Sequence, residues 1–320
     1  IGLQDAVMFA VARRRNIKYI GLRASKLGSG IVFCDPYTEI PIGFKKILDE
    51  FEGSKDAIPK KHSDFASQHL GALRSKYSIP TYMQETAKDA KYLERHFLKR
   101  FIEILVSLSR YKRKAPFFHL NLKQLIKYRL IRMANTWQLR NKKGKSLFSS
   151  SSELSGKKFL IFPLQFEPEA TTLVRSFPYI DQIYVAKQIS KTLPDDIYLA
   201  VKEHRGNEGY RKIKDYEDLY YEPNIILLPR IMDVGKLIQD SCGVITMSGR
   251  MGWEALALNK PVFCLGRAFW TDFKGVLNLK SLEDLGFHYT DEKCFCEEEK
   301  YTESDLIAYA AAYHAKTFSG

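Results

Sequence analysis

From residue 156 onward, short apolar runs alternate with stretches of helical period. The apolar runs have the length of strands, are bounded by turn residues, and lie at 159–164, 197–202, 225–228, 243–247 and 261–265. Helical patterns lie at 180–193, 232–241 and 250–259, and a last amphipathic stretch occupies 304–318. Strands that alternate with helices of about ten residues predict βαβ units and a parallel sheet. We therefore expect residues 151–320 to form a doubly wound α/β domain.

The N-terminal part has a less regular pattern. A helical stretch at 3–15 leads into strand-like runs at 17–22 and 30–35, and residues 44–137 are mostly helical in period. The tract at 144–156 is polar and rich in serine, which is typical of a linker. We place the boundary there, with an N-terminal domain at 1–150 and a C-terminal domain at 151–320. Because the chain opens partway through a βα unit, we expect the first domain to lack upstream residues.

Composition narrows the class of protein. A chain of 320 residues with 45% hydrophobic content is long enough for two domains. No window reaches the roughly 18 consecutive apolar residues of a spanning helix, so we expect a soluble protein. Five scattered cysteines suit reduced thiols in a cytoplasm. Cys294, Cys296 and His288 resemble half a metal site, but its second half is absent and we expect no metal.

The basic charge is concentrated in one segment. The net charge is +13, and residues 104–152 contain twelve Lys and Arg but no Asp or Glu. Across 104–145 these cations alternate with Leu, Ile, Phe and Trp, a pattern that favours helices lying on anionic lipid. A solvated basic face over an ordinary core explains the pattern equally well. Because no aromatic RNA motif or zinc finger accompanies the charge, we expect no nucleic-acid partner.

A strand, a turn and a helix follow each other at 243–259. In an open parallel sheet, ligands lie beyond the carboxyl ends of the strands. Ser248, Gly249 and Gly252 stand where unpaired amides and the helix dipole attract an anion, and glycine allows its close approach. The Glu254 carboxylate would then lie near a ribose. The alternative is that Ser248 only caps the helix and Glu254 only complements its dipole.

Two further loops follow predicted strands. Lys202, His204, Arg205 and Arg211 gather after 197–202, where cations and an imidazole suit a phosphate or a sugar carboxylate. Gln165, Glu167 and Thr171 follow the strand at 159–164; a polar loop that caps the next helix is their alternative interpretation. These side chains are expected at the same edge of the sheet as Ser248.

Several motifs in order resemble one known family. PLQFEPEATT, VKEH with GYR, VITMSG with GWEAL, and KPV with LGRAF occur within 159–273. This part of the chain resembles the capsule polysaccharide biosynthesis family, which includes bacterial capsule Kdo transferases. The resemblance implies a GT-B fold, in which two Rossmann-like domains face each other across a cleft. The N-terminal one would hold the acceptor, be truncated here and carry the basic helical insertion, and the C-terminal one would hold the nucleotide sugar.

The resemblance also implies roles for residues. Gln165 would face the cleft, Arg211 would belong to the donor site, and Glu167 and His204 are the candidates for the catalytic base. The other implied contacts are also with the donor. Lys202 and His204 would contact a phosphate or a donor carboxylate. Ser248, Gly249 and Gly252 would contact phosphate, and Glu254 would contact the ribose. The sequence departs from the family at Arg205, where proline is common, and at Arg250, where a small hydroxyl residue is usual. Arg250 at the anion site would strengthen phosphate binding or indicate a different donor.

The implied activity is a glycosyl transfer in capsular or surface polysaccharide synthesis. The donor would be a nucleotide sugar, with CMP-Kdo as one candidate, and the acceptor a glycan or glycolipid. Because no Asp-x-Asp motif ends a predicted strand, we expect neither a metal nor another cofactor. Assembly on lipid carriers would place the protein in the cytoplasm, at the inner face of the membrane. A nucleotide-sugar epimerase of the same fold and a non-catalytic capsule assembly or export partner are the alternatives.

Overall fold

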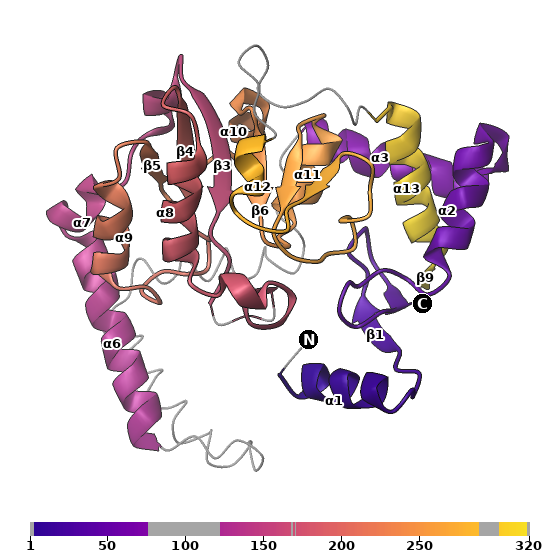
Figure 1. Ribbon diagram of the computed structural model, residues 1–320, viewed down its shortest axis with the longest axis horizontal. Coiled ribbons are helices and arrows are strands. Elements are labelled where there is room, and N and C mark those ends of the chain that lie inside the picture. Colours follow the sequence, from indigo (N-terminus) through magenta and orange to yellow (C-terminus); the bar gives the residue numbers. More distant parts are fainter. Residues whose placement is uncertain (1–2, 76–121, 168, 170, 288–300, 319–320) are drawn as a thin grey trace.

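The structure is a computed structural model that describes residues 3–75, 122–167, 169, 171–287 and 301–318 (Figure 1). His288, Cys294 and Cys296, for which no metal is expected, and residues 104–121 of the basic segment lie outside the described residues. Within the described part of the chain, no helix combines the length and apolar character needed to cross a membrane.

A six-stranded parallel sheet forms the larger part of the fold. Its strands lie in the order β5-β4-β3-β6-β7-β8, so β3 lies centrally between β4 and β6. Their bounds are β3 (Lys158–Pro163), β4 (Ile197–Lys202), β5 (Ile225–Leu228), β6 (Gly243–Thr246), β7 (Val262–Cys264) and β8 (Val276–Asn278). The five predicted strands, the parallel sheet and the α/β class are therefore confirmed. The pattern missed β8, because three residues are too few to show a period.

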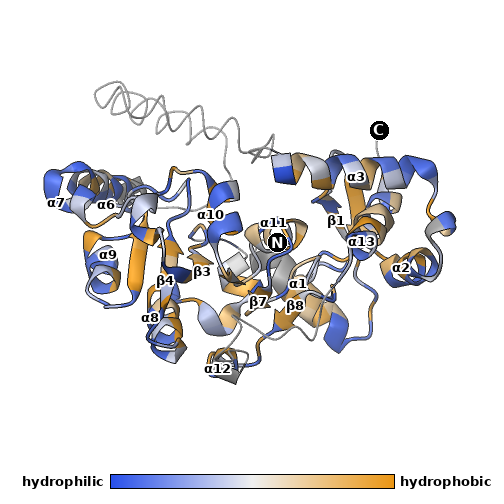
Figure 2. Cartoon of the chain, turned by 90° about the horizontal axis from the view of Figure 1, so that it is seen from above, coloured by the Kyte–Doolittle hydropathy of each residue, from blue (hydrophilic) through white to orange (hydrophobic). Residues whose placement is uncertain are grey.

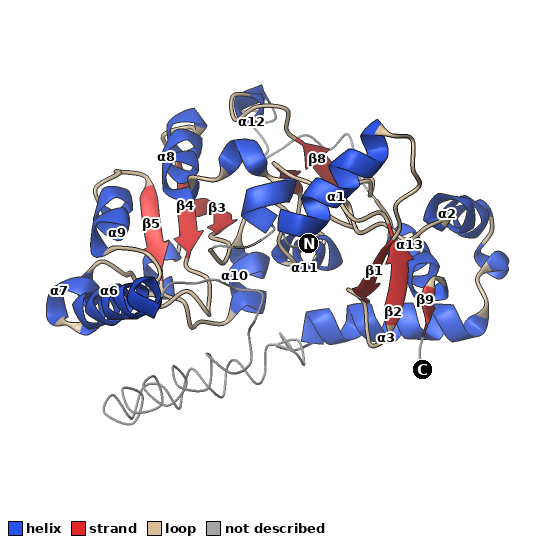
Figure 3. Ribbon diagram, turned by 90° about the horizontal axis from the view of Figure 1, so that it is seen from below, coloured by secondary structure: helices blue, strands red, loops and turns tan. Residues whose placement is uncertain are grey.

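Helices cover both faces of this sheet, and β3 shows why. Phe159 and Ile161 belong to one apolar cluster, whereas Leu160 and Phe162 belong to another. A strand buried on both faces has a continuous apolar run instead of an alternating one. The covering helices are α8 (Gln182–Thr192), α9 (Ile213–Tyr220), α10 (Val234–Asp240), α11 (Met251–Ala257) and α12 (Asp284–Phe287), of which α8, α10 and α11 were predicted (Figure 3).

A smaller antiparallel sheet joins the two ends of the chain. The strand β2 (Ile31–Cys34) pairs with β1 (Gly21–Ala24) on one side and with β9 (Thr317–Phe318) on the other. The helices of this part are α1 (Leu3–Arg14), α2 (Phe44–Gly53), the short turn η1 (Lys55–Ala57), α3 (Lys60–Ser75) and α13 (Glu303–Ala315). Helix α13 packs against α2 and α3, with the Phe44 and Tyr309 rings 4.9 Å apart (Figure 2). The C-terminal end thus lies with the N-terminal residues.

The segment before β3 packs on the larger sheet. It comprises α6 (Leu122–Arg140), α7 (Lys142–Ser146) and the turn η2 (Ser151–Leu154). Asn135 Nδ2 on α6 donates to the carbonyl of Gly209 at 3.1 Å, and Ser149 N donates to the carbonyl of Leu227 at 2.8 Å. The division at residue 150 stays a prediction. Helix α6, which precedes residue 150, packs on the larger sheet, whereas α13, which follows it, packs against α2 and α3.

Candidate functional site at the carboxyl edge of the larger sheet

The candidate site lies where the strand order changes direction. The chain continues from β3 to β4 on one side and places β6 on the other side, so the carboxyl ends of β3 and β6 flank a topological switch point. Gln165 follows β3 and Gly249 follows β6, and a Cβ atom on Gly249 would lie 2.8 Å from Nε2 of Gln165. Gly249 therefore allows the two loops to meet closely.

A buried ion pair fixes the loop that follows β4. Arg211 Nη1 lies 2.8 Å and 3.1 Å from the two carboxylate oxygens of Glu203, and these side chains are only 3% and 4% exposed. The Tyr216 hydroxyl donates to Glu203 Oε2 at 2.7 Å. Burial lowers the pKa of Arg211, but Glu203 and Glu167 more than offset this effect, so the pKa lies above its ordinary value. Arg211 is therefore charged and, through its ion pair with Glu203, stabilises this loop from inside the protein.

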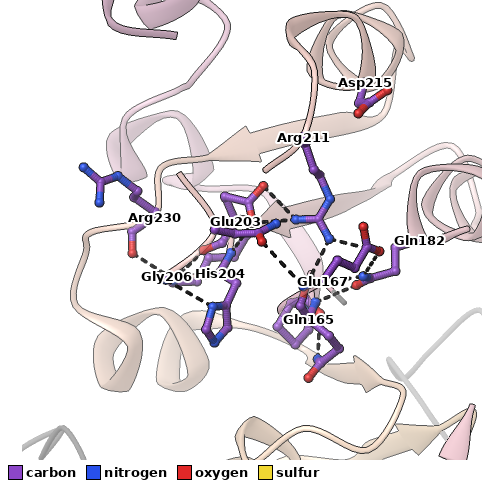
Figure 4. Close-up of polar contacts among 12 residues, drawn as sticks. Gln165, Glu167, Gln182, Glu203, His204, Gly206, Arg211, Asp215 and Arg230 are labelled. Atoms are coloured by element: carbon purple, nitrogen blue, oxygen red, sulfur yellow. Dashed lines mark hydrogen bonds and ion pairs between the residues drawn. The ribbon is translucent and has the colours of Figure 1, made fainter. Parts of the chain in front are cut away.

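Arg211 also reaches the loop that follows β3 (Figure 4). Its Nη2 donates to the carbonyl of Gln165 at 2.9 Å and lies 3.3 Å from Glu167 Oε1. Gln182, the first residue of α8, donates from Nε2 to the Glu167 carboxylate and accepts from Gln165 N at 2.5 Å. The structure thus brings Gln165, Glu167 and Arg211 together. Glu167 remains 34% exposed and is accessible to a ligand.

Lys202 is the buried cation at the end of β4. Its Nζ donates to the carbonyls of Glu203 at 3.1 Å and Arg230 at 3.3 Å, and the residue is 6% exposed. An ammonium group has three donors, and within the described part of the chain Lys202 Nζ makes these two bonds. One donor is therefore left for a ligand. Burial lowers the pKa of Lys202 to about 8, with a further lowering by Arg205 that Glu203 and Glu254 oppose. The side chain is therefore mostly charged at neutral pH.

His204 is a neutral imidazole in this site. Burial and the charges of Lys202 and Arg211 lower the pKa of His204 to about 4. Its Nδ1 accepts a hydrogen bond from Gly206 N at 3.1 Å, so the ring proton is assigned to Nε2. A neutral ring with this tautomer donates from Nε2 and has no free lone pair for a base. The ring contacts Phe166 edge to face, with centroids 5.6 Å apart.

The turn between β6 and α11 differs from the expected capping geometry. Helix α11 begins at Met251 with Arg250 at its cap and no side-chain capping bond, so the capping interpretation of Ser248 is wrong. Ser248 is buried, and its hydroxyl has no hydrogen-bond partner among the described residues. Gly249 N already donates to Thr246 Oγ1 at 3.3 Å. The turn therefore offers the Ser248 hydroxyl to a ligand, whereas the amide of Gly249 is engaged within the protein.

Arg250 and Glu254 form an ion pair at the start of α11. Arg250 Nε lies 3.1 Å from Glu254 Oε1, and the Glu254 side chain is buried. Burial raises the pKa of Glu254 more than the charges of Arg250 and Lys202 lower it. One carboxylate oxygen is thus bound by Arg250, the residue that stands where the family usually has a small hydroxyl residue. A ribose role for Glu254 stays a prediction.

Gly252 is explained by packing. A Cβ atom there would lie 2.4 Å from the Trp270 ring, so we expect Gly252→Ala to destabilise the fold by about 1–3 kcal/mol through overpacking. Gly71 on α3 has nothing within 4 Å of its Cβ position. Gly71→Ala is the matched control and should raise stability by about 0.5–1 kcal/mol. Urea unfolding of both variants measures the difference, and equal stabilities would contradict this account. A phosphate contact by Gly252 stays a prediction.

Several loops that follow strands of the larger sheet contain buried donors without a partner. Among the described residues, five buried side-chain atoms without a hydrogen-bond partner lie in loops that follow β3, β4 and β6: Arg175 Nε, Ser176 Oγ, Arg205 Nε, Asn207 Nδ2 and Ser248 Oγ. Buried polar atoms are nearly always paired, and each exception calls for an explanation, such as a bound water, ion or ligand. All five can donate, so the partner they suit is rich in acceptor oxygens, such as a phosphate or a sugar.

A comparison with known protein families identifies the family of this chain. The sequence model for capsule polysaccharide biosynthesis proteins matches residues 56–294, about three quarters of the chain. The chain belongs to the capsule polysaccharide biosynthesis family. A comparison with curated proteins returns no match.

Solved structures are similar to this capsule family member only at low identity. The β-Kdo 2,7 transferase structure of Thermosulfurimonas dismutans KpsC is 14% identical with a TM-score of 0.47, covering 94% of this chain and 73% of that one. A Staphylococcus aureus MnaA–UDP structure is 15% identical with a TM-score of 0.36, covering 51% and 45%. Anabaena HepE with UDP-glucose is 15% identical with a TM-score of 0.32, covering 53% and 50%.

Sequence reasoning missed several residues of the site. Glu203 was not singled out, although a carboxylate directly after a buried strand is itself a signal of an internal ion pair. Gln182 and Tyr216 lie on helices, and no role was predicted for either of them, although Gln182 ends the motif YIDQ of the family resemblance. The contribution of α6 was missed as well: Arg140 pairs with Glu208 at 2.8 Å, and the Arg132 guanidinium lies 3.9 Å from the centre of the Tyr210 ring. Two cations of the basic segment thus support the loop after β4.

The described residues contain no group of three or more His, Cys, Asp or Glu side chains arranged to hold a metal ion. Independence from metals stays a prediction, and its test is activity after treatment with a chelator.

Proposed function

We propose that this capsule family member is a glycosyltransferase that binds a nucleotide-sugar donor at the carboxyl edge of the larger sheet. The observations that carry the proposal are the buried, unpaired donors in the loops after β3, β4 and β6 and the buried ammonium of Lys202 at the end of β4. An acceptor-rich anion satisfies these donors. Family membership supports a sugar as the transferred group.

The geometry suits different roles for Lys202, His204 and Glu167. In the transfer, an acceptor hydroxyl attacks the anomeric carbon, the bond from that carbon to the phosphate oxygen breaks, and the nucleotide leaves with the electron pair. Lys202 and the Nε2–H of His204 would stabilise the charge on the leaving phosphate. Because His204 lacks a free lone pair, we assign the base that takes the acceptor proton to Glu167, a partly exposed carboxylate.

Ligand-induced thermal stabilisation tests donor binding. CMP-, UDP-, GDP- and CDP-linked sugars are screened, since a ligand that binds only the folded state raises the melting temperature. We expect one nucleotide class to stabilise the protein, and Glu254→Ala and His204→Ala to remove that shift while remaining folded. If none stabilises it, a non-catalytic assembly or export role gains support.

Product analysis then tests the reaction. With donor and an acceptor glycan, a glycosyltransferase releases nucleotide and lengthens the acceptor. Glu167→Gln should lower this rate by about 100-fold or more while the donor still binds. Donor alone serves as the control: formation of an epimerised nucleotide sugar without an acceptor would indicate an epimerase instead.

Donor affinity should depend on pH through Lys202. Its pKa is lowered to about 8 in the folded protein, so the ammonium is present below that pH and is lost above it. Affinity for the phosphate should therefore fall as pH rises through about 8, by at most about tenfold per pH unit. Calorimetry from pH 7 to 9.5 measures this, with Lys202→Met as the control that should lose the dependence. An unchanged profile in that variant would contradict the assignment.

Peripheral membrane contact through α6 is a second part of the proposal. Ile126, Leu130 and Trp137 recur along one side of α6 and are exposed, opposite the side that places Asn135 on Gly209. Exposed cations such as Lys127 accompany this stripe within a segment that lacks acidic residues. An apolar stripe flanked by cations suits an anionic lipid surface.

Vesicle co-sedimentation tests the contact. The protein should bind phosphatidylcholine vesicles that contain phosphatidylglycerol, release at high salt, and bind pure phosphatidylcholine weakly. Leu130→Ser with Trp137→Ser should reduce binding at least tenfold, whereas Tyr221→Ser, an exposed aromatic elsewhere, should not. Equal binding to both vesicle types would remove the electrostatic basis of this idea.

A further inference from the structure

A buried ion pair joins the smaller sheet to the loops of the candidate site. Glu39, in the loop between β2 and α2, pairs through Oε1 with Nη2 of Arg175, and the two side chains are 5% and 8% exposed. Lys26 Nζ lies 3.2 Å from the other oxygen of Glu39, but its side chain is 41% exposed. One carboxylate therefore has a buried partner and an exposed one.

The loop that carries Glu39 has a defined conformation. Asp35 Oδ1 accepts hydrogen bonds from Tyr37 N at 2.9 Å and Thr38 N at 2.8 Å, which closes a turn. Glu39 itself has a φ of 62°, in the left-handed region that residues other than glycine rarely adopt. Such a conformation persists only where the surroundings hold it. The Tyr37 hydroxyl also donates to the carbonyl of Arg175 at 3.4 Å, so two side chains of this loop hold one residue across the interface.

Arg175 belongs to the chain segment that leads from the site to α8. It ends the short turn η3 (Thr171–Arg175), which is followed by the turn η4 (Phe177–Tyr179) and then by α8. At the start of α8, the Gln182 side chain accepts a hydrogen bond from the backbone N–H of Gln165 and donates one to the carboxylate of Glu167. The segment is thus tied at one end to the smaller sheet and at the other end to two residues of the candidate site.

The electrostatics of the pair favour a permanent tie. Burial raises the pKa of the Glu39 carboxyl, but the charges of Arg175 and Lys26 lower it further, so that the pKa lies below its ordinary value. Glu39 is therefore ionised at neutral pH. Removing its charge would leave Arg175 buried with Nε already unpaired.

We propose that Glu39 is a positioning residue, which through Arg175 sets the conformation of the loop that carries Gln165 and Glu167. The inference rests on the proposed function only in that this loop belongs to the donor site. It assigns to the smaller sheet a direct part in ordering a site that is built on the larger sheet.

Hydrogen–deuterium exchange of the full chain tests this without any ligand. Glu39→Gln should speed exchange across 164–182 at least tenfold, including the Gln165 amide that now donates to Gln182. Lys26→Gln, which removes only the exposed partner of the same carboxylate, should leave that exchange within about twofold of the wild-type rate. Equal exchange in wild type and Glu39→Gln would overturn the proposal.

A double variant separates positioning from stability. Glu39→Gln with Arg175→Gln leaves no buried charge unpaired, so its melting temperature should return toward that of wild type. Exchange across 164–182 should nevertheless stay fast, because the Glu39–Arg175 contact is still missing. For the same reason the KM for the donor should be raised in the double variant and in Glu39→Gln alike. Exchange that recovers together with the melting temperature would overturn the proposal. If wild type binds no nucleotide sugar, the proposed function fails, while the exchange result still decides the role of Glu39.

Discussion

Replacing Lys202 by Met is expected to weaken donor binding about 100-fold, which corresponds to about 2.7 kcal/mol. The ammonium is buried, and a charge-assisted hydrogen bond to phosphate is strongest where water is excluded. The methionine side chain fills a similar volume and brings no charge into the interior, so the variant should remain folded. Calorimetric titration with the nucleotide sugar found by screening gives the change in affinity.

Lys214→Met provides the matched control, since Lys214 is exposed on α9. It removes the same charge from the chain and should change donor affinity less than twofold at physiological salt. A loss of affinity equal in both variants would mean that net charge, and not the position of Lys202, attracts the donor. An unchanged affinity in Lys202→Met would place the phosphate elsewhere.

Glu203→Gln is expected to lower the free energy of unfolding by about 3 kcal/mol, because it leaves the Arg211 charge buried with only the longer contact to Glu167. Urea unfolding followed by circular dichroism measures this loss. Asp240→Asn is the control, because the Lys236–Asp240 pair is exposed and such pairs contribute at most about 1 kcal/mol.

A second substitution shows whether the loss comes from the unpaired charge. Glu203→Gln combined with Arg211→Met removes both charges and should recover part of the lost stability. Donor binding should be weak in this double variant, since it lacks the Arg211 hydrogen bond that links the loop after β4 to the carbonyl of Gln165. A loss below about 1 kcal/mol in Glu203→Gln alone would show that the pair contributes no more than an exposed one.

The candidate site was only partly predictable from the sequence. Lys202, Ser248 and Gln165 were expected at one edge because the residues that end parallel strands share an edge whatever the strand order is. Ser248 was given a capping alternative that the backbone excludes, because the start of α11 depends on local geometry. Arg211 was predicted to contact the donor, and the structure places it inside a network with Glu203 and Gln165. Whether it also contacts the donor stays a prediction.

Most elements of the larger sheet could be predicted from the amino-acid sequence alone. Strands β3 to β7 are buried on both faces and therefore have continuous apolar runs, and the helices between them have amphipathic periods. Family membership also follows from the order of local motifs. The fold was needed to show that β6 lies beside β3, that α13 packs against α2 and α3, and that Glu39 pairs with Arg175. These contacts join residues far apart in the chain, and a local pattern carries no information about a partner at such a distance along the sequence.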